Sequence, residues 1–284
     1  MRQVDRSIVN TPNNLLNLTS EQKTHLSDHK NIRSDIYAHE DVKQALKTIY
    51  HDKCYICECY VGDSYDVEHY LPKKSFSHLG YTWGNLHKVC TQCNLAKESD
   101  QFFLKDPTSG NITDILLLDP SNPTYYIKDY LSFNLDGLAV LIDSGTDPLV
   151  RRKAEHTVRY LNGELKKSQG KPFEHASKLN HSRAARIGAF ERSLRENNFI
   201  NFRDNILNIH YVTGNYIAKT TPLEIKLDKD TYAFLANTFK IFLDDHCNFC
   251  STLRDYCFSA FGITFTELKD VLGLLRRVYN LPIY

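Results

Sequence analysis

The sequence predicts an α+β protein that is mostly α-helical, in which a short segment of strands between cysteine pairs is followed by a helical domain. Three observations lead to this prediction. Two CxxC pairs bracket a segment with short strand-like runs. The dipeptide Asp136-Gly137, which favours tight turns, separates two alternating apolar runs. From about residue 147 onward, apolar residues recur three and four positions apart, as they do on the buried face of a helix.

Shifts in these patterns divide the chain into four predicted regions. Residues 1–38 are polar and are expected to form an N-terminal arm, with a short helix over about 20–28. Residues 39–105 contain both CxxC pairs and are predicted to form the domain that holds the functional site. Residues 106–146 are predicted to be a linker with a β-hairpin, and residues 147–284 a helical domain.

Apolar spacing predicts the individual elements. A helix over about 39–50 is expected because Val42, Leu46 and Ile49 recur at helical spacing. The hairpin strands are predicted from alternating apolar residues on each side of the turn: Phe133 and Leu135 before it, and Leu138, Val140 and Ile142 after it. The last region is expected to contain helices over about 148–161, 173–197, 229–246 and 266–279.

Composition and charge narrow the classes of protein. The 284 residues are 42% hydrophobic and 24% charged, which favours a folded chain over a disordered one. No apolar run approaches the roughly 18 residues that a membrane span needs, and no apolar stretch follows Met1-Arg2. We therefore expect a cytoplasmic protein that does not span a membrane. The net charge of +1 does not decide nucleic-acid binding, because a local basic surface is sufficient for it.

Two cysteine pairs predict a structural zinc site formed by Cys54, Cys57, Cys90 and Cys93. Disulfides are not expected in a reducing compartment, whereas two CxxC turns brought together supply the four thiolates of a tetrahedral Zn²⁺ site. The separation of the pairs, 90 − 57 = 33 positions, exceeds that of a simple zinc ribbon, so we expect the chemistry in the insert. Cys59, which lies two residues beyond the first pair, is left outside this set.

A third CxxC pair leaves two interpretations open. Cys247 and Cys250 lie beside His246, with Cys257 seven residues further on, and could form a second metal site. Cysteines on a helix end among apolar residues also pack commonly into a core. The sequence alone does not decide between them.

The insert between the first two pairs contains a motif that resembles the HNH endonuclease family, also called the His-Me finger or ββα-metal family. The motif consists of three segments, Asp66-Val67-Glu68-His69-Tyr70-Leu71-Pro72-Lys73, Trp83-Gly84-Asn85-Leu86-His87 and Cys93-Asn94-Leu95-Ala96-Lys97. The three letters of the family name correspond here to His69, Asn85 and Asn94. The resemblance implies a ββα unit, and it implies that Asn85 holds the loop that aims the His69 ring.

The chemistry of phosphodiester hydrolysis gives the other residues their expected roles. A base must deprotonate water, and the His69 imidazole, with an ordinary pKa near 6.5, suits that role. A hard cation such as Mg²⁺ or Mn²⁺ must balance the phosphate charge, so we expect Glu68 and Asn94 to be its ligands. Asp66 is the second candidate carboxylate, because it shares strand parity with Glu68.

Strand geometry sets a condition on this site. On a regular strand Glu68 and His69 would point to opposite faces, so the strand is expected to twist or end at this point, as Pro72 favours. Nearby lysines are expected either to contact phosphates or to form a solvated face. They are Lys73, Lys74, Lys88 and Lys97. Further basic residues are expected to form a solvated helix face, or else a nucleic-acid track or a surface for an acidic partner. They are Arg151-Arg152-Lys153, Lys166-Lys167, and Arg183, Arg186, Arg192 and Arg195.

The first half of the chain also resembles the PtuB-like HNH nuclease subunit of Septu-type antiphage systems and the HNH proteins of some retrons. The cues are Met1-Arg2, residues 68–73, Trp83-Gly84-Asn85-Leu86, Leu118-Asp119-Pro120 and the turn from Phe133 to Gly137. This resemblance implies an endonuclease that acts on DNA in antiphage defence, with a partner ATPase of PtuA type. Two alternatives remain open: an RNA or tRNA nuclease, and a zinc-braced adaptor that binds nucleic acid or protein without cutting.

Overall fold

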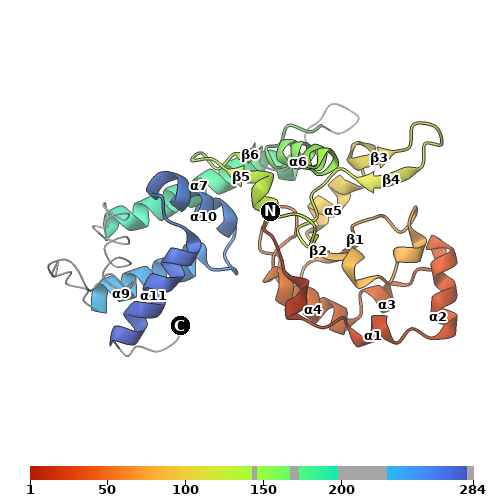
Figure 1. The fold of residues 1–284 in the computed structure, drawn as a ribbon, viewed down its shortest axis with the longest axis horizontal. Coiled ribbons are helices and arrows are strands. Elements are labelled where there is room, and N and C mark those ends of the chain that lie inside the picture. The colour runs from red at the N-terminus through yellow and green to blue at the C-terminus, as the bar shows by residue number, and fades with distance from the viewer. Residues whose placement is uncertain (143–145, 167–172, 198–228, 280–284) are drawn as a thin grey trace. The chain divides into compact units, whose positions relative to one another are not determined.

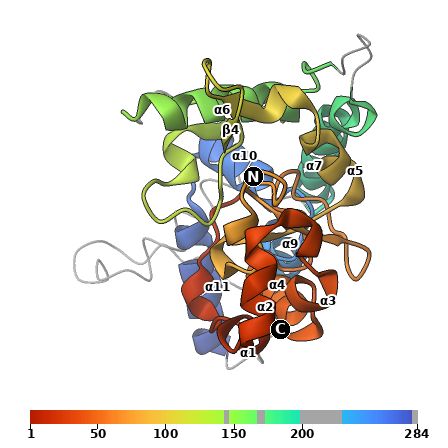
Figure 2. The same cartoon turned by 90° about the vertical axis from the view of Figure 1, so that its right-hand side faces the viewer.

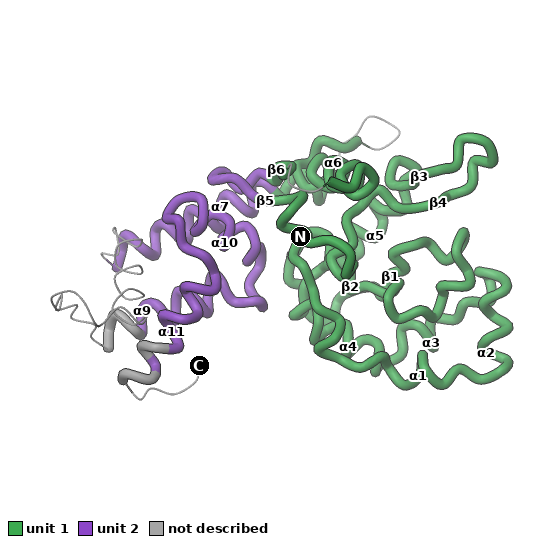
Figure 3. Tube along the Cα trace, viewed as in Figure 1, with its two compact units in different colours: residues 1–132, 139–179 green, residues 133–138, 180–284 purple. Residues whose placement is uncertain are grey.

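The computed structural model describes residues 1–142, 146–166, 173–197 and 229–279 (Figure 1). Two compact units divide the chain, as Figure 3 shows. Unit 1 consists of Met1–Ser132 and Ala139–Leu179, and unit 2 of Phe133–Leu138 and Asn180–Tyr284. In the part of the chain that the structure describes, no helix combines the length and apolar character needed to cross a membrane. The boundaries of the four regions predicted from the sequence differ from those of these two units, and the four regions remain a prediction.

Unit 1 begins with short helices that lie together in both views (Figures 1 and 2). They are α1 (Asn13–Leu16), α2 (Ser20–Thr24), α3 (Ser34–Tyr37) and α4 (Glu40–Tyr50). The helix predicted over 39–50 is confirmed as α4, whose residues Val42, Leu46 and Ile49 are buried. The short helix predicted near residue 20 is confirmed as α2, which a 3-10 turn extends. At the end of α4, His51 takes a left-handed conformation that redirects the chain into the first cysteine pair.

The site-bearing part of unit 1 is a two-stranded antiparallel sheet followed by a helix. Strand β1 (Asp66–His69) pairs with β2 (Leu86–Val89), and α5 (Thr91–Lys97) packs against β1. Glu68 lies opposite His87, and His69 lies opposite Leu86. The strand ends at His69, which meets the condition for Glu68 and His69 to reach one pocket.

The rest of unit 1 contains a second hairpin, part of a third, and further helical segments. Strand β3 (Phe103–Lys105) pairs with β4 (Ile112–Ile115) across a register shift, a hairpin that was not predicted. Strand β5 (Leu131–Phe133) pairs with β6 (Ala139–Leu141), followed by α6 (Pro148–Leu161) and the start of α7 (Glu174–Glu196). Helices α6 and α7 confirm the helices predicted over about 148–161 and 173–197.

The predicted Asp-Gly hairpin exists, but its strands are shorter than the apolar alternation suggested. Leu135 and Leu138, expected in the strands, lie in the connection and are exposed. The Asn134 carboxamide oxygen accepts hydrogen bonds from the backbone N–H groups of Asp136 and Leu138, and Gly137 has a φ of 75°. This closed turn therefore outcompetes continued strand pairing, because Asn and Gly satisfy it locally.

The described residues of unit 2 are mainly helical, apart from its share of the hairpin. It contains most of α7, then α9 (Lys229–Thr238), a π-helical turn (Phe239–Leu243), α10 (Cys250–Phe261) and α11 (Phe265–Tyr279). Its core includes Phe190, Leu253 and Ile263. The helix predicted over 229–246 is confirmed as α9 with the π-helical turn, and the helix predicted over 266–279 as α11. Helix α10 was not predicted as a separate helix. The described residues thus form a mixed fold of helices and small two-stranded sheets.

Candidate metal centre and active-site pocket

The four predicted cysteines form a buried cluster in unit 1. The sulfur atoms of Cys54, Cys57, Cys90 and Cys93 all lie within 4.8 Å of one another. The Sγ atoms of Cys57 and Cys90 are 3.9 Å apart, close to the edge of about 3.8 Å expected for a tetrahedron with zinc–sulfur bonds of about 2.3 Å. The cluster could therefore hold a metal ion such as zinc.

Backbone geometry creates the two halves of this cluster. In the first pair, the backbone N–H of Glu58 donates to the Cys54 carbonyl, and Glu58 has a φ of 61°, which turns the chain tightly. In the second pair, Cys90 is the N-cap of α5, and its Sγ accepts a hydrogen bond from the Cys93 N–H at 3.4 Å. Helix α6 reaches the same cluster, because the Tyr160 hydroxyl donates to the Cys93 Sγ at 3.3 Å.

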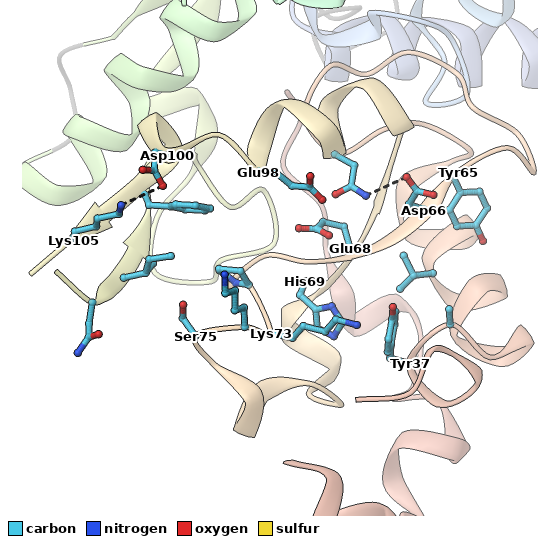
Figure 4. A pocket seen from close by; sticks show the side chains of 18 of the residues that line it. Tyr37, Tyr65, Asp66, Glu68, His69, Lys73, Ser75, Glu98, Asp100 and Lys105 are labelled. Atoms are coloured by element: carbon cyan, nitrogen blue, oxygen red, sulfur yellow. Dashed lines mark hydrogen bonds and ion pairs between the residues drawn. The ribbon is translucent and has the colours of Figure 1, made fainter. Parts of the chain in front are cut away.

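A pocket of about 1000 Å³ lies beside this cluster's helix, within unit 1 (Figure 4). Residues of β1, α5 and the β3–β4 hairpin line it, together with the segment after β1. Three of the residues predicted to act chemically, Glu68, His69 and Asn94, line this one pocket. Asp66, the second candidate carboxylate, lines it as well.

The His69 side chain is held in one orientation. Only 4% of the residue is exposed, and its ring meets the Tyr37 ring edge-on with 4.5 Å between the centroids. Its Nε2 donates to the Gly80 carbonyl oxygen at 2.8 Å, so the unprotonated nitrogen of the neutral ring is Nδ1. Burial lowers the pKa of His69 to about 4, and the ring is therefore neutral at pH 7.

Glu68 and Asn94 line the same pocket but have different partners. The buried Lys97 ammonium donates to the Glu68 carboxylate, and to the His69 carbonyl oxygen at 2.6 Å. The Asn94 amide nitrogen donates to Asp66 at 3.1 Å, which leaves its carboxamide oxygen as an acceptor (Figure 4). Carboxylate and amide oxygens on one pocket wall are the donors that Mg²⁺ or Mn²⁺ prefers, so this set fits such an ion.

Asn85 lies outside the pocket lining and holds the segment behind His69. Its buried side chain accepts a hydrogen bond from the Leu71 N–H at 2.7 Å and donates to the Leu71 carbonyl at 3.0 Å. It also donates to the Leu79 carbonyl at 3.4 Å, one residue before the Gly80 carbonyl that binds His69. Asn85 is thus placed to fix the loop that orients the imidazole.

The lysines near the motif divide into two groups. Lys73 and Lys74 line the pocket. The expectation of a phosphate contact or a solvated face is wrong for Lys88, which is buried and donates to Asp52 at 3.1 Å and to the Gly62 carbonyl at 2.7 Å. Lys97 is buried as well, since its ammonium binds Glu68 from inside the protein.

Two of the predicted basic stretches are partly structural. Lys153 on α6 is buried and forms an ion pair with Asp114 at 2.8 Å. Arg183 on α7 is buried and donates through Nε to the Gly137 carbonyl at 2.5 Å. Neither residue is therefore part of a solvated basic face, and Lys167 lies outside the described residues.

The observed places of two residues at the end of α5, Lys97 and the C-cap Glu98, were not assigned from the sequence. Glu98 lines the same pocket as Glu68, as Figure 4 shows. Lys97 is the partner of Glu68. Both lie three or four residues after Asn94, a spacing that places side chains on one helix face and could have identified them.

The third CxxC pair does not form a metal cluster with other donors in the described residues. Neither of the two candidate metal-binding groups found there includes Cys247 or Cys250. Cys250 is buried, Cys257 belongs to the core of unit 2, and the Cys247 thiol donates to the Lys240 carbonyl at 3.0 Å. These contacts favour the packing interpretation.

Comparison with known proteins finds two relatives with the same name. The chain is 28% identical over 116 residues to Septu protein PtuB from Bacillus thuringiensis, which covers 40% of this chain and 42% of that protein. It is 28% identical over 125 residues to Septu protein PtuB from Bacillus mycoides (strain KBAB4), which covers 36% of this chain and 42% of that protein. These matches support a distant relationship to PtuB. They span about two fifths of the curated relatives, and no family model matches the chain.

Proposed function

We propose that this chain is a metal-dependent endonuclease of the HNH type that hydrolyses phosphodiester bonds in DNA. The single observation that carries the proposal is the shared pocket, in which a neutral imidazole with a fixed tautomer lies beside oxygen donors. The order β1, β2, α5 corresponds to the ββα unit that the motif implies. The buried cysteine cluster next to α5 supplies the structural zinc site that would brace this unit.

The residues of the pocket have complementary roles in this proposal. Nδ1 of His69 accepts a proton from the attacking water, while the Gly80 carbonyl holds the Nε2–H and favours the charged ring that results. Lys73 and Lys74 on the pocket wall bind phosphate oxygens. A Mg²⁺ or Mn²⁺ ion held by Glu68 and Asn94 would stabilise the negative charge of the phosphate and of the departing 3′ oxygen. By family analogy the products carry 5′-phosphate and 3′-hydroxyl ends.

The biological context of the proposal is antiphage defence. It is supported by the similarity to Septu protein PtuB and by the motif that the sequence shares with HNH subunits. In this setting the chain acts with an ATPase of PtuA type that positions the nuclease or holds it inactive. RNA or tRNA is the alternative substrate, because the pocket chemistry does not read the sugar.

One observation favours a second candidate, a zinc-braced adaptor that does not cut. The Lys97 ammonium already neutralises Glu68, the carboxylate assigned to the metal. An adaptor could retain such an ion pair as a purely structural contact. A nuclease must displace it, or leave it in place and use the other carboxylates of the pocket.

Cleavage of plasmid DNA separates the two candidates. We expect Mg²⁺- or Mn²⁺-dependent nicking by the chain, alone or with an ATPase of PtuA type. His69→Ala should lower the rate by at least about 100-fold, because general-base catalysis contributes about that much or more. His78→Ala is the matched control, since His78 is exposed and does not line the pocket. Unchanged cleavage by His69→Ala would refute the role of His69, and no cleavage under any condition would favour the adaptor.

A further inference from the structure

Two additional metal-binding side chains lie beside the four-cysteine cluster. The donor atoms of Cys57, Cys59 and His175 all lie within 4.8 Å of one another. The Nε2 atom of His175 is also 3.9 Å from the Sγ atom of Cys90. Six sulfur and nitrogen donors therefore occupy one region of unit 1, two more than a tetrahedral zinc ion uses.

We infer that Cys57, Cys59 and His175 bind a second thiophilic divalent cation such as Zn²⁺, with the Cys57 thiolate shared between the two ions. Two thiolates and one imidazole are a ligand set typical of zinc. The fourth position can be filled by water, because Cys59 and His175 are only half-buried. The resulting centre holds two cations rather than one.

Local backbone conformation explains how Cys59 reaches this place. On an extended chain Cys59 would lie about 7 Å along the chain from Cys57, and it was not expected among the zinc ligands. Glu58 instead adopts a left-handed conformation with a φ of 61°, and the Cys54 N–H donates to the Cys59 carbonyl at 3.0 Å. The loop therefore closes on itself and returns Cys59 to the cluster.

The contribution of His175 depends on tertiary structure. It lies at the start of α7, 175 − 57 = 118 positions after Cys57. Phe173, two residues earlier, is buried and packs edge-on against Phe102 and Tyr160 with 6.0 Å between ring centroids in each pair. Because Tyr160 also donates to Cys93, this aromatic cluster fixes the start of α7 against the cysteine site.

Charge balance favours the second cation. One Zn²⁺ with four thiolates has a net charge of 2 − 4 = −2, and a fifth thiolate at Cys59 beside a neutral His175 would make it 2 − 5 = −3. Concentrating that charge among largely buried groups is unfavourable, because burial penalises uncompensated charge. A second divalent ion brings the centre to 4 − 5 = −1.

Metal stoichiometry of the full chain tests the inference. Thiolate-to-metal charge-transfer absorbance during Cd²⁺ titration counts sulfur-bound ions and ignores ions in the oxygen-lined pocket. We expect two equivalents per chain, and two equivalents of zinc by elemental analysis of the reconstituted protein without added Mg²⁺. The double variant Cys59→Ser/His175→Gln should bind one. The matched control is Cys247→Ser/His246→Gln in unit 2, which should retain two.

Each alternative outcome overturns the inference. If the wild-type chain binds only one equivalent of Cd²⁺ through sulfur, Cys59 and His175 do not bind a second ion and at most replace other ligands of the first. Two equivalents in the Cys59→Ser/His175→Gln variant would place the second ion elsewhere. If circular dichroism shows that the double variant misfolds, ¹¹³Cd NMR of the wild-type chain and of His175→Gln takes its place. We expect two ¹¹³Cd resonances in the wild-type chain and a shift of one of them in His175→Gln. A single resonance in the wild-type chain would refute the two-cation centre. None of these readouts depends on nuclease activity.

Discussion

At the residue scale, the most informative contact of the site is the bond between Lys97 and Glu68. Burial lowers the pKa of Lys97, and the Glu68 carboxylate opposes this effect. The lysine side chain is only 3% exposed, whereas the Glu68 side chain is 20% exposed on the pocket wall. The buried Lys97 ammonium therefore needs the Glu68 carboxylate more than Glu68, which water can reach, needs Lys97.

This inequality predicts different effects of two variants on stability. Glu68→Gln leaves the Lys97 ammonium buried without its carboxylate and should cost about 3–5 kcal/mol of unfolding free energy. Lys97→Met removes the buried charge and leaves Glu68 in contact with water, so it should cost less. Chemical denaturation of the metal-free proteins measures both values. An equal or larger loss in Lys97→Met would contradict the assignment of Lys97 as the desolvated partner.

At the element scale, most of the longer helices and the Asp136-Gly137 turn could be predicted from the sequence, whereas α10, the strand ends and the long-range partners could not. Helix α4 could be predicted because Val42, Leu46 and Ile49 form one apolar stripe. The β3–β4 hairpin was missed because its strands are short and half-exposed, without a clear apolar alternation. The convergence of Lys97 on Glu68, and of His175 on the cysteines, depends on tertiary packing that local spacing does not encode.

Helix α6 carries a histidine that should make stability depend on pH. Burial, and next the positive charges of Arg159 and Arg152, lower the pKa of His156 to about 4 from an ordinary 6.5. The unfolded chain therefore binds a proton more readily, and stability should fall as pH falls from 6.5 toward 4. His156→Gln should show a shallower fall between pH 7 and pH 5 by denaturant titration. An unchanged slope would exclude a contribution from this residue.

The cysteine cluster joins several elements, so metal removal should affect the whole of unit 1. Cys93→Ser should lose metal and lower the melting temperature by about 10 °C, because site formation is coupled to folding. Cys257→Ser in the core of unit 2 is the control and should retain metal. Equal metal content in wild type and Cys93→Ser, measured by elemental analysis, would argue against a metal at this cluster.

At the scale of the whole molecule, the four-cysteine cluster and the pocket both belong to unit 1. His69, Asn85 and Asn94 could be assigned to one site from the sequence motif alone, because phosphodiester hydrolysis requires particular residue types. The motif does not show that Asn85 stands behind the pocket, since that depends on the fold of the loop from Leu71 to Gly80. Unit 2 has no assigned role.

A partner is also a property of the whole chain. If the chain acts in a Septu-like system, co-expression with an ATPase of PtuA type should give a complex on size-exclusion chromatography. DNA cleavage should then depend on the partner, because an unregulated nuclease would damage host DNA. A lone chain that is fully active and does not co-elute with the ATPase would contradict this prediction.

The most direct test of the central claim is chemical rescue of His69→Ala. In this variant the pocket of about 1000 Å³ can admit free imidazole at the place of the missing ring. Imidazole should restore part of the Mg²⁺- or Mn²⁺-dependent DNA cleavage in His69→Ala and have no such effect on wild type. Full cleavage by His69→Ala without imidazole would show that this pocket does not use His69 as its base.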